Sequence, residues 1–187
     1  MMIRTFIALE IPDEPLNEII KIRNENYPSQ SGVKWEPVDK LHLTLKFLGD
    51  TEEKLVEKIS NDISTVISQN NELDLYFTEF GMLKRNGQPK IVWVGIKEDQ
   101  KLLSLVNSVE NICSTYGFQK EKRSFKPHIT ILRIKGREDL EQLYGLSKTK
   151  FEPINFTSST LTFFKSELKP SGSTYTAMQK FYLRRSK

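Results

Sequence analysis

Residues 41–50 read LHLTLKFLGD, and their opening pattern returns once, around the only other histidine of the chain, in PHITILR at residues 127–133. In both segments apolar residues alternate with His and Thr. Each therefore predicts a β-strand that buries its apolar side chains and turns His and Thr together to the opposite face. Chance would place both histidines in such a triplet only about once in ten thousand. The repetition indicates a shared role.

The two strands supply a matched set of polar side chains, His42 with Thr44 and His128 with Thr130. A single histidine in an apolar strand is more often a partly buried residue satisfied by one hydrogen bond. Core packing, however, gives no reason for both histidines to occupy equivalent strand positions. Two imidazoles that face one cleft can act as one acid and one base near neutral pH, and the two hydroxyls can donate hydrogen bonds to phosphate oxygens.

Strand alternation also places the residues that follow each pair. Lys46 shares the face of the first His-Thr pair and is expected at the rim of the cleft. Phe47 has the opposite parity, which favours packing in the core over stacking on a base. Arg133 follows the second motif, and its guanidinium suits phosphate. Strict alternation turns it away from His128, so it reaches the cleft only if the strand ends, twists or bulges at Leu132.

The remaining pattern predicts an α+β fold. Helical periodicity and caps predict helices over residues 16–26, 52–68, 98–116 and 138–143. Besides the two His strands, β-formers and turn residues predict strands over 5–11, 33–36, 73–83, 90–96, 151–152, 155–164 and 175–183. The residues 49–51 are expected to end the first His strand and to cap the next helix. Each half of the chain repeats the same order of elements: strand, helix, His strand and helix. This order fits antiparallel sheets with outer helices, and we expect a single domain over residues 1–187.

Composition fits a globular protein and narrows the site chemistry. Of the 187 residues, 37% are hydrophobic, which suffices for a core. No apolar run approaches the roughly twenty residues of a membrane span, and no signal peptide is evident, so we expect a cytoplasmic protein with no membrane contact. The single cysteine, Cys113, allows no internal disulfide and lies on the apolar stripe of a predicted helix, which favours packing.

Charge and motifs exclude several function classes. The net charge of +4 is mild, but basic stretches at residues 84–90 and 120–126 can attract polyanions, although either can equally be an ordinary solvated loop. The sequence contains no P-loop, no glycine-rich dinucleotide turn and no nucleophile elbow. The histidines lie 86 positions apart, and the polar residue that follows each of them, two positions later, is Thr and not a carboxylate. This pattern lacks the spacing of a zinc site, so we expect neither metal nor cofactor.

The two His-x-Thr-x motifs resemble those that name the 2H phosphoesterases, and within them the RNA 2′,3′-cyclic phosphodiesterases once called 2′-5′ RNA ligases. The resemblance covers nearly the whole chain. Besides the two motifs, it includes the opening strand at residues 4–10 and a closing stretch at residues 161–183 that contains Tyr175. It implies two pseudo-symmetric lobes of antiparallel sheet with outer helices, and an active-site cleft between them to which each lobe contributes one histidine.

The resemblance also implies an activity and a role for each side chain. The expected reaction is metal-independent hydrolysis of a 2′,3′-cyclic phosphate on RNA or on a nucleotide to a 2′-phosphate, with weak reverse 2′-5′ ligase activity. His42 is expected to protonate the departing 3′ oxygen and His128 to deprotonate water, while Arg133 contacts the phosphate. Tyr175 and the turn at residues 170–173 are expected to border the cleft, and the protein is expected to be a monomer.

The sequence also allows an alternative function, that of a non-catalytic nucleotide or RNA-binding module on the same fold. The matched His-Thr pairs speak against it, because a binder does not need both an acid and a base. Turnover of a nucleoside 2′,3′-cyclic phosphate distinguishes the two.

Overall fold

The computed structural model describes residues 1–28, 32–170 and 172–185 and contains two four-stranded sheets, all of whose strand pairs are antiparallel. The first sheet has the order β2-β1-β7-β8, with β1 Met2–Glu10, β2 His42–Glu52, β7 Thr160–Lys169 and β8 Gly172–Tyr182. The second has the order β5-β4-β3-β6, with β3 Leu73–Arg85, β4 Gln88–Ile96, β5 His128–Arg133 and β6 Ile154–Ser158. The expected α+β class is confirmed.

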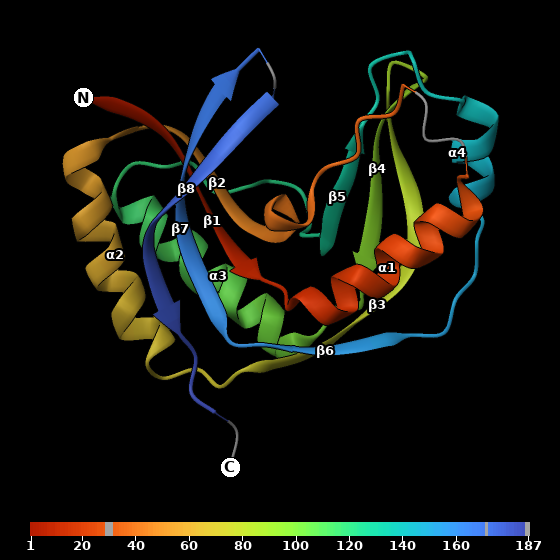
Figure 1. Cartoon of the computed structure of the whole chain (residues 1–187). Coiled ribbons are helices and arrows are strands. Elements are labelled where there is room, and N and C mark those ends of the chain that lie inside the picture. Colours follow the sequence, from red (N-terminus) through yellow and green to blue (C-terminus); the bar gives the residue numbers. More distant parts are fainter. Residues whose placement is uncertain (29–31, 171, 186–187) are drawn as a thin grey trace.

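Four α-helices and one 3₁₀ helix are described: α1 Asp13–Asn26, α2 Glu53–Ile67, α3 Gln100–Thr115, α4 Leu140–Leu146 and η1 Val38–Lys40. Figure 1 shows α2 and α3 beside the first sheet and α1 and α4 beside the second. Helix α1 follows β1, a strand of the first sheet, but covers the second sheet. Helix α3 follows β4, a strand of the second sheet, but covers the first sheet. Each sheet is thus covered partly by a helix from the other half of the chain.

Local signals in the sequence account for the elements that were predicted best. The apolar stripe of α3 is buried, and the Asp99 side chain caps the helix by accepting from the backbone N–H groups of Lys101 and Leu102. The hairpin of β3 and β4 turns at Asn86 and Gly87, which both have positive φ as a tight hairpin turn requires. No helix among the described residues is long and apolar enough to cross a membrane.

Several boundaries differ from the sequence-based prediction. β2 does not end at Gly49, because Gly49 takes a φ of +72° and pairing with β1 continues to Glu52. The stretch 155–164 is not one strand: it breaks at Ser159, and its two parts, β6 and β7, join different sheets. Residues 33–36 form a single bridge, Trp35 to Leu132, and residues 151–152 are not a strand. Of the predicted turn at 170–173, residue 171 lies outside the described residues.

The two His strands occupy equivalent places. β2 and β5 are the edge strands of their sheets, each paired with the next strand inward, β1 or β4. They contact each other across the centre of the molecule (Figure 1). The fold therefore brings together two segments that are 86 residues apart in the sequence.

Candidate active site

A cleft between β2 and β5 collects most of the predicted site. It holds an empty volume of about 420 Å³, which includes open space at its mouth. Its lining comprises both His-Thr pairs, two cations, one carboxylate and one tyrosine: His42, Thr44, His128, Thr130, Lys40, Arg133, Glu36 and Tyr175. The structure thus brings together six of the seven side chains that the sequence had suggested, and leaves out Lys46.

His42 is enclosed by aromatic rings. Its imidazole stacks on Phe6 with the ring centroids 4.9 Å apart and on Phe164 at 5.8 Å, and the ring of Tyr175 meets it edge-on at 5.4 Å. Burial lowers the pKa of His42 to about 4; a hydrogen bond to the Lys40 backbone opposes this shift, and the charge of Arg133 adds to it. In the free protein His42 is therefore uncharged at neutral pH.

His128 has a more polar setting. Its Nδ1 lies 2.7 Å from the backbone carbonyl oxygen of Lys126, so Nδ1 is the protonated nitrogen of the neutral ring and Nε2 is left to accept a proton. The only ring in contact is that of Trp93, edge-on at 6.2 Å, among the described residues. This hydrogen bond fixes both the tautomer and the orientation of the imidazole.

A β-bulge decides where Arg133 points. Opposite β4, Leu132 pairs with Val92 and Thr130 pairs with Trp93, so Ile131 has no partner. The extra residue reverses the alternation, and Arg133 joins His128 and Thr130 in the cleft lining. The sequence predicts the required irregularity at Leu132, and the structure has it one residue earlier, at Ile131.

Among the described residues that line the cleft, Glu36 is the one with an acidic side chain, and no sequence signal indicates it. The Arg133 Nε lies 3.6 Å from Glu36 Oε1. The backbone N–H of Glu36 donates to the carbonyl oxygen of the bulged Ile131 at 2.9 Å, which ties the segment before η1 to β5. Lys40 and the stacked rings of Phe6 and Phe164 were likewise not predicted as parts of the site.

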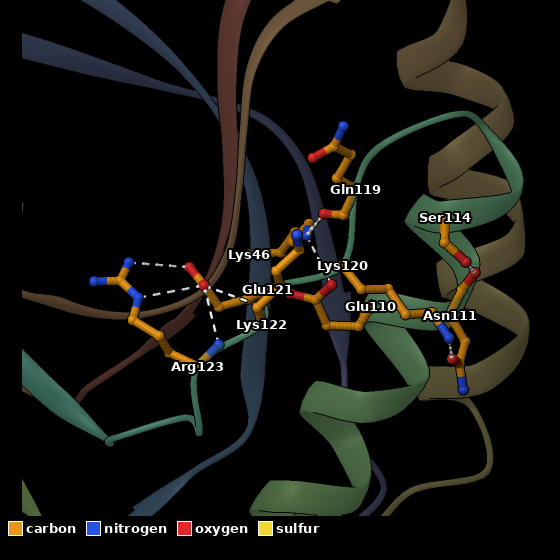
Figure 2. Close-up of polar contacts among 9 residues, drawn as sticks. All are labelled: Lys46, Glu110, Asn111, Ser114, Gln119, Lys120, Glu121, Lys122 and Arg123. Atoms are coloured by element: carbon orange, nitrogen blue, oxygen red, sulfur yellow. Dashed lines mark hydrogen bonds and ion pairs between the residues drawn. The ribbon is translucent and has the colours of Figure 1, made fainter.

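Lys46 is not at the rim of the cleft, contrary to its predicted parity. Leu45 is unpaired between Thr44 and Lys46, so a second bulge turns Lys46 to the face that α3 covers. There its Nζ lies 2.7 Å from Glu110 Oε2 and 2.7 Å from the Gln119 carbonyl oxygen, as Figure 2 shows. Its side chain is only 6% exposed.

The same bulge overturns the prediction for Phe47. It pairs with Phe6, whose ring contacts His42, so Phe47 lies on the cleft face of the sheet and not in the core. Its side chain is 51% exposed. Cys113, by contrast, is buried as predicted, and burial raises the pKa of its thiol to about 12, so it stays protonated at neutral pH.

The cleft can bind an anion and move protons. Two imidazoles, two hydroxyls and a guanidinium face one volume, which suits a phosphate group more than an apolar ligand. Among the described residues, no group of three or more His, Cys, Asp or Glu side chains is arranged to hold a metal ion.

Comparisons with known proteins point to one family. The sequence model of a family described as the 2′-5′ RNA ligase superfamily matches residues 11–170. An RNA 2′,3′-cyclic phosphodiesterase of Thermotoga maritima is 30% identical over 173 residues, which is 92% of this chain and 91% of the relative. A protein of the same name from Methanothermobacter thermautotrophicus is 27% identical and is covered over its full length, by 98% of this chain.

Solved structures share the fold. The protein TT0787 of Thermus thermophilus superposes with a TM-score of 0.79 at 23% identity, over 98% of this chain and 100% of that one. E. coli LigT, in a structure complexed with 3′-AMP, superposes with a TM-score of 0.75 at 22% identity, over 98% of this chain and 99% of that one.

Proposed function

The chain belongs to the 2′-5′ RNA ligase superfamily, and from this membership and its cleft we propose that it is a phosphodiesterase that opens the 2′,3′-cyclic phosphate of an RNA end or of a nucleotide. The main observation behind the proposal is the cleft itself, whose lining includes two imidazoles from different sheets, two hydroxyls and a guanidinium. Relatives that span almost the whole chain are named RNA 2′,3′-cyclic phosphodiesterase, which supports the same substrate class.

The proposed reaction needs only groups that this cleft has. Water attacks phosphorus, its oxygen forms the new P–O bond, and the bond from phosphorus to the 3′ oxygen breaks. One imidazole takes the proton from water and the other gives a proton to the 3′ oxygen, which leaves a 2′-phosphate and a 3′-hydroxyl. Thr44 and Thr130 donate to non-bridging oxygens, and Arg133 holds the negative charge that develops on them.

We assign His128 as the base and His42 as the acid. An accepting Nε2, fixed by the hydrogen bond from Nδ1 to the Lys126 carbonyl, supports the base role. For His42 to donate, it must be protonated when substrate is bound, although its pKa in the free protein is about 4. A bound phosphate anion raises that pKa, because it offsets Arg133 and attracts the imidazolium. The acid role therefore depends on the substrate.

The first experiment is turnover of adenosine 2′,3′-cyclic phosphate, with the product identified by chromatography against the 2′- and 3′-monophosphates. We expect 2′-AMP. No hydrolysis by folded protein that still binds the substrate would favour the non-catalytic binding module instead, and 3′-AMP would reverse the orientation of the substrate.

A metal-free reaction is a separate expectation, since the proposed steps use side chains alone. The rate should be the same before and after dialysis against EDTA. Activity that is lost on chelation and regained with a divalent cation would contradict the mechanism.

The acid and the base can be told apart with a substrate that has a better leaving group at the 3′ position. Such a substrate needs no acid, so it should partly rescue His42→Ala but not His128→Ala. Rescue of His128→Ala instead would exchange the two roles.

The weak reverse 2′-5′ ligase activity also remains to be measured. By microscopic reversibility, the same acid and base can join a 2′,3′-cyclic end to a 5′-hydroxyl RNA. Incubation of two such oligonucleotides should yield a small amount of 2′-5′-linked product.

A further inference from the structure

One aromatic side chain on the cleft face has no part in the proposed chemistry. Among the described residues, the exposed large hydrophobic side chains include two aromatic ones, Phe47 at 51% and Tyr182 at 68%. Phe47 lies on β2, the strand of His42, and is paired directly with Phe6 on β1. An exposed aromatic residue by itself is ordinary, so its surroundings must decide whether it has a role.

A cation lies over this ring. The guanidinium carbon of Arg4 is 4.7 Å from the centroid of the Phe47 ring, within the range of a cation–π contact. Arg4 is exposed and makes no ion pair with any described residue. The exposed Asp50 pairs with Arg4 across β1 and β2 but forms no ion pair with it. The Phe47 ring and the Arg4 guanidinium therefore form one exposed unit, which we name the Arg4–Phe47 platform.

The platform is close to the cleft but separate from it. The β1 partners of His42 and Phe47 are Glu10 and Phe6, four residues apart, which corresponds to about 13 Å along the strand. The Phe47 ring also points toward the far end of β2, since a Cβ at Gly49 would lie 3.8 Å from its Cε1. Neither Arg4 nor Phe47 lines the cleft. A group on the platform is thus next to, and not part of, the unit that carries the reacting phosphate.

We propose that the Arg4–Phe47 platform stacks the base of a nucleotide on the 5′ side of the terminal nucleotide, which carries the 2′,3′-cyclic phosphate. The preferred substrate is then an oligonucleotide and not a mononucleotide. This proposal rests on the phosphodiesterase function proposed above. Single-stranded RNA is commonly held by aromatic rings on which unpaired bases stack, with arginine beside them for the backbone phosphates. Every base has a flat face, so the platform is expected to tolerate any base at this position.

The test compares two substrates, adenosine 2′,3′-cyclic phosphate and a trinucleotide that ends in the same group. We expect the wild-type protein to have the higher kcat/KM on the trinucleotide. Stacking of one base is commonly worth about a tenfold or larger change in affinity. Phe47→Ala should therefore reduce the ratio of kcat/KM for trinucleotide over mononucleotide about tenfold, mainly through KM. Arg4→Ala should reduce it in the same direction, and Phe47→Trp should preserve it.

Tyr182→Ala is the matched control, because it removes the other exposed aromatic side chain of the same sheet. Tyr182 pairs with Thr160 at the start of β7, whereas Arg4 of the platform pairs with Ser166 near the end of that strand. It should leave the ratio as in the wild type. A ratio unchanged by Phe47→Ala overturns the platform while leaving the phosphodiesterase function intact. An equal loss on both substrates also overturns it, since the ring then holds the terminal nucleotide. A wild-type protein that hydrolyses neither substrate overturns both proposals.

Discussion

β2 and β5 carry the same His-x-Thr motif and the same bulge one residue after the threonine, yet the residues that follow differ in chemistry. The fourth residue after the histidine is buried in both strands, as the charged Lys46 in β2 and as Leu132 in β5. The fifth lies on the cleft face in both, as Phe47 and as Arg133. The shared backbone provides the symmetric geometry, and the side chains around it make the two halves chemically unequal.

The histidines show the same inequality. His42 is stacked against aromatic rings and has a pKa of about 4, whereas His128 is held by a backbone carbonyl and borders one indole ring edge-on. Two identical motifs can thus supply two different proton-transfer groups, since neighbours and burial set the pKa of a group.

The largest expected effect tests whether both halves are needed. His42→Ala and His128→Ala should each lower kcat about 10²- to 10⁴-fold, because either removes one partner in proton transfer. The measurement is steady-state hydrolysis of adenosine 2′,3′-cyclic phosphate by variants whose circular dichroism matches the wild type. A near-normal kcat in either folded variant would show that the two histidines do not act together as acid and base.

The second prediction concerns the buried residue after each bulge. Lys46→Ala should lower the free energy of unfolding by about 3–5 kcal/mol, since it leaves Glu110, which is 13% exposed, without its partner. Leu132→Ala should cost about 2–5 kcal/mol through the cavity that it creates. Urea unfolding measures both.

A double variant distinguishes an unpaired buried charge, the expected cause of instability in Lys46→Ala, from a cavity, the expected cause in Leu132→Ala. Lys46→Met combined with Glu110→Met removes both charges and should recover much of the stability lost in Lys46→Ala, because apolar replacement of a buried pair is often neutral. Leu132→Ala leaves no charge without a partner, so removal of a second side chain should not restore its stability. Equal instability of the double and single variants would show that the hydrogen bond from Lys46 to the Gln119 carbonyl matters more than the ion pair.

The third prediction is a pH dependence of stability that belongs to His42. Its folded-state pKa of about 4 lies below the usual value of 6.5, so the unfolded chain binds more protons between these pH values. The free energy of unfolding should therefore fall as pH drops from about 6.5 to 4, by about 3 kcal/mol from this residue. His42→Gln should lose that part of the slope, and His128→Gln serves as the comparison. The same slope in His42→Gln as in the wild type would argue against a buried neutral imidazole.

The smallest expected effect concerns Arg133. Arg133→Met should lower kcat/KM about 10- to 100-fold, the usual worth of a charged hydrogen bond to phosphate. It should also raise the pKa of His42, because the charge of Arg133 is one of the causes that lower it. An NMR titration of the His42 ring proton measures the second effect. An unchanged pKa of His42 would show that the charge of Arg133 does not act on this imidazole. An unchanged kcat/KM would show that Arg133 does not bind the phosphate.

The two motifs, the α+β class and most elements can be read from the sequence, because alternation, helical periodicity, caps and turn residues are local signals. It predicted α3 and the β3–β4 hairpin closely, and it placed both His-Thr pairs on one face of each strand. It also indicated that Arg133 needed an irregular strand to reach the cleft.

Which residues lie beside the motifs depends on contacts between distant segments. A bulge adds one unpaired residue and reverses the side-chain alternation, and whether it forms depends on pairing with another strand, so Lys46 and Phe47 were assigned to the wrong faces. Glu36 enters the cleft through a backbone hydrogen bond to a residue 95 positions later, Ile131. The low pKa of His42 likewise depends on rings from β1, β7 and β8, and burial among distant segments is a property of the assembled fold.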